Sequence, residues 1–144
     1  MESVMIAPQE RIDPELERQI LERIQKIPAF TALDIRMEGL AEGRCVAVVP
    51  IKPEFNGIFG TYHGGMLATA ADTVACFALL TQVDPDERMA TTDLNIRYLA
   101  PCLTDVRVDA RVIKRGRTLC PIQVDLTDMN GKTVAIVQVT YIRL

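Results

Sequence analysis

An acid inside an apolar segment and two glycines that precede it have the residue types and the spacing of a possible catalytic site. His63, Gly64 and Gly65 open a long alanine-rich run, and Asp72 stands in its middle. The first N–H groups of a helix lack internal partners and carry the positive end of its dipole. Glycine lets a ligand approach the backbone closely. The Gly64 N–H is therefore a candidate oxyanion donor, Gly65 is a candidate substrate-binding residue, and Asp72 is a candidate catalytic carboxylate.

The spacing of these two groups predicts how the site is built. Eight residues separate Gly64 from Asp72, which is about 12 Å of helical rise. A carbonyl bound at the Gly64 amide would lie about 3 Å from it, beyond easy reach of Asp72 of the same helix. Two helices packed antiparallel across a two-fold axis solve this problem. Ala68, Ala71 and Ala75 would permit their close approach, so we expect a site shared by two chains.

Structural alternatives remain open for each of these residues. An acid in a buried helix can be a hydrogen-bonded residue with no catalytic role. His63 can be an orienting or packing residue rather than a base. A Gly-Gly pair can be a simple turn.

The numbers of serine, histidine and cysteine residues and the absence of phosphate-binding motifs exclude several classes of catalytic and metal site. The only serine is Ser3, so no Ser-His-acid triad can form. The sequence has neither a GxxxxGK[ST] nor a GxGxxG phosphate motif. A single histidine and four cysteines without a CxxC pair give no metal site. The cysteines are typical of small buried hydrophobes with reduced thiols, which indicates a cytoplasmic protein.

Length and charge limit the partners. The chain of 144 residues has a net charge of -3, which argues against a general nucleic-acid binder. Its longest apolar segment contains Asp72 and falls short of the roughly 20 residues that span a bilayer. We therefore expect a soluble protein with no membrane segment. The one tight basic cluster is Lys114, Arg115 and Arg117 around Gly116, which is either a phosphate site or a solvated turn; Arg97 is a second candidate.

Two helices are predicted to position these groups. Residues 1–12 read as a flexible leader, and residues 13–144 as a single domain. A helix begins with Asp13 as N-cap and Pro14 at its first position. The alanine-rich helix spans about residues 63–82, because Pro85 prevents its continuation. It is apolar all round, as expected for a helix surrounded by sheet.

The rest of the chain has the patterns of strands. Short strands are predicted at 31–38 and 43–51, with an irregular loop at 52–65. Alternating or apolar segments at 91–99, 106–113, 119–128 and 133–144 predict four more, with an Asn-Gly hairpin at 129–132. The last segment is apolar on both faces, which suggests that a partner chain covers one of them. The fold class is α+β, an antiparallel sheet of five to six strands wrapped around one long central helix.

The HGG of residues 63–65 and the AADT of residues 70–73 together resemble the hotdog-fold thioesterases. The PaaI-like acyl-CoA thioesterases of the phenylacetate pathway are the most similar branch. The resemblance runs from about Ile27 to the C-terminus. It includes the loop NGIFGTYHGG, the strand TTDLNIRYLAP and the hairpin VIKRGRTL.

This resemblance implies hydrolysis of an acyl-CoA thioester to a free acid and CoA, without metal or cofactor. Gly64 matches the amide that polarises the carbonyl, and Asp72 matches the nucleophile or general base. Asn56 resembles an asparagine that places water or the acid, and Thr91 matches a residue that assists the water. The 114–117 hairpin would lie near the nucleotide. The assembly would be a homodimer at least, or a homotetramer formed as a dimer of dimers.

Two other functions stay open on the same fold. A non-catalytic acyl-CoA binding or sensing protein would have no need of the Asp72 carboxylate. A dehydratase would need an Asp-His pairing that this sequence lacks. The identity of the acyl group is not encoded in any motif of the sequence.

Overall fold

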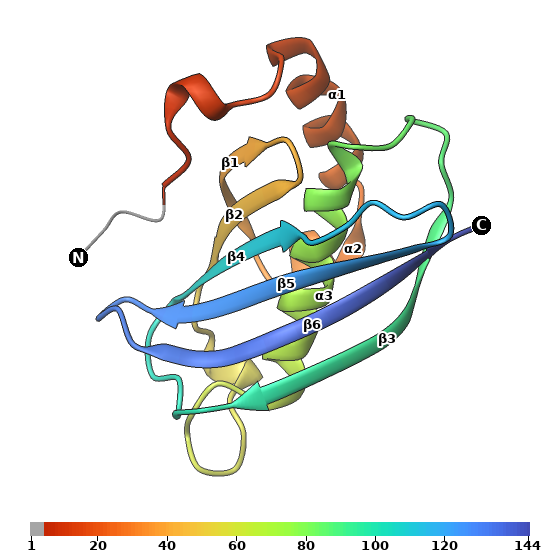
Figure 1. Cartoon of the computed structure of the whole chain (residues 1–144). Coiled ribbons are helices and arrows are strands. Elements are labelled where there is room, and N and C mark those ends of the chain that lie inside the picture. The colour runs from red at the N-terminus through yellow and green to blue at the C-terminus, as the bar shows by residue number, and fades with distance from the viewer. Residues whose placement is uncertain (1–4) are drawn as a thin grey trace.

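The sheet of this protein wraps around a single long helix (Figure 1). The computed structural model describes residues 5–144, and its six strands form one antiparallel sheet in the order β1-β2-β4-β5-β6-β3. The predicted α+β architecture is confirmed. The strands are β1 (Arg36–Ala41), β2 (Arg44–Val49), β3 (Met89–Tyr98), β4 (Val106–Val112), β5 (Leu119–Asp128) and β6 (Thr133–Arg143); the helices are α1 (Pro14–Ile24), α2 (Pro28–Ala32) and α3 (Gly64–Leu80), with 3-10 turns η1 (Pro8–Glu10) and η2 (Pro53–Phe55).

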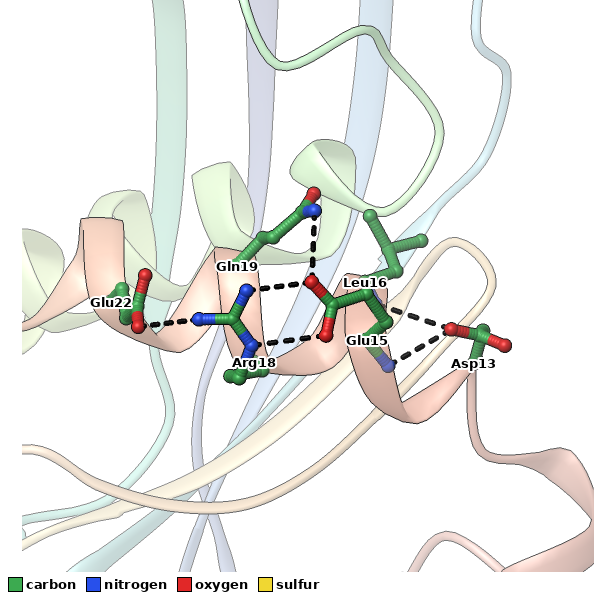
Figure 2. A network of polar contacts seen from close by, with 6 residues as sticks. All are labelled: Asp13, Glu15, Leu16, Arg18, Gln19 and Glu22. Carbon is green, nitrogen blue, oxygen red and sulfur yellow. Dashed lines mark hydrogen bonds and ion pairs between the residues drawn. The ribbon is translucent and has the colours of Figure 1, made fainter.

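Helix α1 begins as its sequence predicts (Figure 2). Oδ1 of Asp13 accepts hydrogen bonds from the N–H groups of Glu15 and Leu16, at 2.9 and 3.4 Å. Arg18 bridges Glu15 and Glu22 on the exposed face, each at 2.6 Å. Such exposed pairs contribute little to stability, because water and salt screen both charges. The helix therefore owes its place mainly to the buried side chains on its other face.

Helix α3 is buried on one side and uncovered on the other, which corrects the expectation of a helix enclosed all round. Its sheet-facing side chains are fully buried and belong to the main core; they include Ala70, Ala71, Val74, Ala75, Phe77 and Ala78. Gly65 and Thr69 are exposed, while Asp72, Thr73 and Cys76 are half-buried. A single sheet curves around only part of a helix, so a strip along α3 stays open.

The first predicted strand begins too early. Residues 28–32 form α2, with Pro28 at its first position, where a missing N–H costs nothing. Asp34 then has a φ of 55°, a left-handed conformation that breaks any extended run. The strand therefore starts only at Arg36.

The segment before α1 makes specific contacts with β1. Ile6 is buried against Ala41 and Val46. Arg11 forms an isolated β-bridge with Ala41 and donates a 2.9 Å hydrogen bond to the carbonyl of Glu38. The flexibility expected of residues 1–12 stays a prediction, and residues 1–4 lie outside the described part of the chain.

The hairpin between β5 and β6 turns where the Asn-Gly pair predicts. Gly131 has a φ of 84°, in the region that favours glycine. Oδ1 of Asp128 accepts from the N–H groups of Asn130 and Lys132, both at 2.9 Å. This side chain holds the turn from the inside, in addition to the Asn-Gly signal.

Strand β3 is an edge strand, and β6 alternates across the sheet. β3 pairs only with β6, and most of its residues are exposed. In β6, Val137, Val139 and Tyr141 face the core, whereas Ile136 is 39% exposed on the other side. No segment within residues 5–144 covers that outer face, so the partner chain expected there stays a prediction. Within the same residues, no helix is long and apolar enough to cross a membrane.

Candidate active site

The Asp72 carboxylate is held by two strands. Its Oδ1 accepts a hydrogen bond from Thr91 Oγ1 at 2.8 Å and another from the Tyr141 hydroxyl at 2.9 Å. Thr91 and Tyr141 lie directly opposite each other in the pairing of β3 with β6, so both reach the helix at the same height. No hydrogen bond within residues 5–144 uses Oδ2 of Asp72. One oxygen is therefore fixed, and the other is available.

The environment of the Tyr141 hydroxyl keeps it protonated, so that it can donate a hydrogen bond. Burial raises its pKa above the ordinary value, because water no longer solvates the charged phenolate. The hydroxyl therefore stays protonated and also lies 2.9 Å from the main-chain carbonyl of Asp72. The sequence analysis missed this residue, although its place among the inward-facing positions of the last strand was a usable signal.

The N-terminus of α3 is capped by His63. Its Nδ1 accepts a 2.9 Å hydrogen bond from the Gly65 N–H. The histidine thus has the orienting role that the sequence left open beside a catalytic one. The Gly65 N–H is already bonded, so Gly65, predicted to bind substrate, has no free amide for it. The Gly64 N–H has no partner within residues 5–144 and is the available donor.

Gly64 opens onto a cleft of about 400 Å³. Tyr62, Leu67, Tyr98 and Cys102 contribute to its walls. The Tyr98 hydroxyl donates a hydrogen bond to the Gly64 carbonyl. A Cβ at position 64 would lie only 3.0 Å from Cζ of Tyr98, so a side chain here would press on the Tyr98 ring. Tyr98 was predicted as a strand residue only, and its contact with α3 was missed.

Asn56 lies in the loop before α3. Its backbone bridges Tyr62 and its N–H donates to the Pro53 carbonyl at 3.1 Å. Its Oδ1 is buried and has no hydrogen-bond partner in the described chain. The structure does not bond this side chain to Asp72 or Thr91, so its predicted role stays a prediction.

Within one chain the two central groups of the site are apart. Gly64 is the first residue of α3 and Asp72 follows eight residues later, or about 12 Å along the helix axis. The Gly64 cleft does not include Asp72. Of the small residues expected between two helices, Ala71 and Ala75 are 0% exposed and pack inside their own chain. That part of the prediction is wrong, because these alanines face the sheet.

The predicted phosphate cluster occupies the loop between β4 and β5. Lys114, Arg115 and Arg117 are exposed, whereas Gly116 is buried. A Cβ at position 116 would lie 2.1 Å from the Leu119 carbonyl oxygen, so this glycine serves the turn. The loop lies near the C-terminal end of β6, at the end of the sheet opposite the loop before α3 (Figure 1).

The structure also gives the positions of Arg97 and of the four cysteines. Arg97 is exposed on the edge strand β3. The four cysteines are free thiols: Cys45, Cys102 and Cys120 are buried, and Cys76 is half-buried. Across residues 5–144, no three side chains of His, Cys, Asp or Glu come together as metal ligands.

Comparison with known proteins relates most of the chain to one group. Residues 18–142 match the family model described as "Domain of unknown function (DUF4442)". Acyl-coenzyme A thioesterase 13 of Homo sapiens is 32% identical over 126 residues, which cover 82% of this chain and 87% of that protein.

Solved structures establish the fold. A thioesterase family protein from Silicibacter pomeroyi superposes with a TM-score of 0.84 at 20% identity, covering 90% of this chain and 98% of that one. The PaaI protein of the E. coli phenylacetic acid degradation operon gives a TM-score of 0.82 at 20% identity, covering 90% and 94%. The hotdog fold predicted from the sequence is confirmed.

Proposed function

The chain belongs to the DUF4442 family of PaaI-like hotdog thioesterases, and we propose that it hydrolyses acyl-CoA thioesters to a carboxylic acid and CoA. The observation that carries this proposal is the Asp72 carboxylate. A half-buried acid with Oδ1 fixed by Thr91 and Tyr141 and Oδ2 free of partners is arranged to act on a bound reactant.

The reaction needs a second group that stabilises negative charge on the carbonyl oxygen. The unbonded Gly64 N–H at the positive end of α3 supplies such a donor. Because it lies about 12 Å along the helix from Asp72, we propose that each site combines Gly64 of one chain with Asp72 of another. A homodimer is then the smallest active unit.

The surface around the Gly64 cleft supports this assembly. Ile58 and Phe59, in the loop before α3, are 92% and 90% exposed. Tyr98 and Leu99, at the rim of the cleft, are 49% and 59% exposed. The adjoining edge of β3 is unpaired in one chain, and such edges readily pair with another chain. A second copy would cover these apolar side chains and bring its own Asp72 to the cleft.

The chemistry can follow two routes that share the same residues. In one, Oδ2 of Asp72 attacks the thioester carbon, the C–S bond breaks, and water hydrolyses the resulting anhydride. In the other, Asp72 takes a proton from water, whose oxygen attacks the same carbon. In both, the Gly64 N–H stabilises the oxyanion, the CoA sulfur leaves as a thiolate and is then protonated, and one water is consumed.

The CoA nucleotide needs cations, and the exposed Lys114, Arg115 and Arg117 are the proposed contacts. None of the three makes an ion pair within residues 5–144, so their charges are available to phosphate. Their distance from Gly64 of the same chain fits a substrate that extends across two chains. No metal or cofactor is required for this reaction.

The carboxylate is tested by Asp72→Asn. Free thiol release from a panel of aliphatic and aromatic acyl-CoAs should fall by at least about 100-fold, in the range of general acid–base contributions. Asp86→Asn is the matched control, because it makes the same change at an exposed position. Unchanged turnover in folded Asp72→Asn would eliminate the mechanism, and wild-type inactivity on every thioester would favour a non-catalytic acyl-CoA binder.

The shared site is tested by mixing two inactive variants. Gly64→Pro removes the N–H at the first helical position, where proline is tolerated, and His63 already has an extended backbone that can precede it. The exposed Tyr98 ring must shift slightly to admit it. Subunits of Gly64→Pro and Asp72→Asn, unfolded and refolded together, should regain activity, because each mixed dimer holds one intact site. No recovery in verified mixed dimers would contradict a site built from two chains.

A further inference from the structure

The first turn of α3 needs support from outside the helix. It begins with Gly64 and Gly65, and each glycine in a helix is about 1 kcal/mol less favourable than alanine. The N–H groups of a first turn also lack carbonyl partners within the helix. The direction of the Gly64 N–H, the proposed oxyanion donor, therefore depends on the contacts that hold this turn.

The peptide unit that joins Gly64 to Gly65 is held at both ends. Its N–H donates to Nδ1 of His63 at 2.9 Å. Its carbonyl accepts the hydrogen bond from the Tyr98 hydroxyl. On the other side of Gly64, the His63 carbonyl accepts from two N–H groups of the first turn, at 3.0 and 3.1 Å. Because both neighbouring peptide units are fixed, the Gly64 N–H keeps one direction.

Tyr98 is anchored in the sheet and reaches the helix from there. It is the last residue of β3 and lies opposite Ala135 of β6. Leu99, next in the chain, donates to the Val134 carbonyl at 2.8 Å. The Tyr98 ring lies against Gly64, since a Cβ at that position would be 3.0 Å from Cζ and 3.2 Å from Cε1. The hydroxyl thus ties the start of α3 to a strand that packing has already fixed.

The Tyr98 hydroxyl is committed to the Gly64 carbonyl. Burial raises the pKa of Tyr98 above its ordinary value, so the group stays protonated at neutral pH. A phenol has one proton to donate, and this proton is directed at the Gly64 carbonyl. The hydroxyl therefore holds the peptide and does not itself donate to a reacting carbonyl.

The same strand holds both chemical groups of the site. Thr91 of β3 bonds to Asp72 at 2.8 Å, and Tyr98 at the end of β3 bonds to the Gly64 carbonyl. In the proposed dimer, each chain gives its Gly64 to one site and its Asp72 to the other. β3 is also the edge strand of the sheet, so a contact between chains along it would align both groups with those of the partner.

Resting on the proposed function, we propose that Tyr98 is a positioning residue, whose hydroxyl directs the Gly64 N–H at the thioester carbonyl. Its contribution belongs to the transition state, because negative charge develops on the carbonyl oxygen only as the reaction proceeds. Loss of the hydroxyl should therefore lower kcat and leave KM nearly unchanged. Loss of an oxyanion donor costs about 100- to 1,000-fold in kcat, and a misdirected donor should cost less.

Tyr98→Phe tests this role, because it removes the hydroxyl and keeps the ring against Gly64. With an acyl-CoA that wild type hydrolyses, we expect kcat to fall about three- to ten-fold, the size of one neutral hydrogen bond. KM should stay within about two-fold of wild type, because the ground-state contacts of the substrate are kept. Urea unfolding followed by circular dichroism verifies that the variant is folded under the assay conditions.

A mixed dimer gives the sharper measurement. Gly64→Pro and Asp72→Asn chains with different affinity tags are purified as mixed dimers, in which only the Asp72→Asn chain contributes a working Gly64. Tyr98→Phe added to that chain should lower kcat by the same factor as in the uniform variant. The same change added to the Gly64→Pro chain acts at the inactive site, so the two mixed dimers should differ in kcat by that factor.

The other outcomes overturn the proposal. Equal losses in the two mixed dimers mean that the hydroxyl acts on the contact between chains. A loss confined to KM means that it binds the acyl group as a wall of the cleft, and an unchanged kcat in the uniform variant removes any role of the hydroxyl.

Failure of the proposed function has its own signature in the same experiment. If the parent mixed dimer without Tyr98→Phe is inactive while wild type hydrolyses thioesters, the site shared by two chains is wrong. The kcat of the uniform Tyr98→Phe variant then decides the role of Tyr98 alone. Inactivity of wild type on every thioester would remove the proposed function, and this proposal with it.

Discussion

The two sides of α3 use similar residues for different purposes. On the covered side, Val74, Phe77 and Ala78 are 0% exposed and form the centre of the core. On the uncovered side, Asp72 is held by side chains from two strands, and Thr73 bonds back to the carbonyl of Thr69 at 2.7 Å. The difference teaches that packing fixes the helix from one side, so that the other side can present a carboxylate in a constant position.

The largest expected effect is a difference in protein stability between variants on the covered and the uncovered side of α3. Phe77→Ala should lower the free energy of unfolding by about 3–5 kcal/mol, because it empties a fully buried aromatic site. Thr73→Ala, on the uncovered side of the same helix, should change it by less than about 0.5 kcal/mol. Urea unfolding followed by circular dichroism measures both. Similar losses for the two variants would mean that the uncovered side is also part of the core.

The next effect concerns how the carboxylate is held. Tyr141→Phe removes one of the two donors to Oδ1 of Asp72, and hydrogen bonds to charged groups contribute about 1.5–3 kcal/mol. We expect kcat/KM with an active acyl-CoA to fall about ten-fold or more.

Tyr62→Phe is the matched control for that change. The Tyr62 hydroxyl is buried and has no hydrogen-bond partner in the described chain, so its loss removes no contact with Asp72. The comparison of Tyr141 with Tyr62 fails if both variants lose activity equally, since the effect would then come from burial of any tyrosine hydroxyl.

A smaller effect is expected at the start of the helix. His63→Ala removes the N-cap and should destabilise the protein by about 1 kcal/mol. His63→Asn keeps a side chain suited to that position and should restore most of the loss. Thermal and urea unfolding of the two variants provide the measurement, and equal stability of His63→Ala and wild type would contradict the capping role.

The smallest effect lies at the other end of α3 and depends on pH. A hydrogen bond from Arg143 lowers the pKa of Glu87 below its ordinary value of about 4.3. The ionised pair therefore stabilises the folded state above that value, and its contribution is lost as the pH falls through the lowered pKa. The stability difference between wild type and Glu87→Gln should shrink between pH 6 and pH 3, whereas Glu54→Gln, an exposed control, should show no such trend. A difference independent of pH would argue against the pair.

Local signals in the sequence predicted the elements that local chemistry controls. Asp13 and Pro14 start α1, Asn130 and Gly131 turn the last hairpin, and the alternation in β5 gives its buried face. The exception is the segment at 31–38, where Pro28 and Asp34 outweigh a pattern typical of a strand. Within the site, the sequence identified Asp72 and Gly64 as candidates, and the family resemblance added Thr91, but Tyr141 and Tyr98 were missed.

The partners were missed because they come from distant parts of the chain. Tyr141 is 69 residues from Asp72, and Tyr98 is 34 residues from Gly64. No local pattern reports which strand will lie against which turn of a helix. The cleft beside Gly64 likewise exists only once separate segments pack together.

By itself, the sequence determined the order and kind of most elements, the alanine-rich helix and the position of its one acid, because turn residues, caps and hydrophobic periodicity act over a few residues. The tertiary structure alone decided which side of α3 is open, which oxygen of Asp72 is held, and that the Gly64 and Gly65 amides differ in availability. These depend on the curvature of a sheet and on contacts between residues far apart in the chain, which cooperative packing of the whole domain fixes.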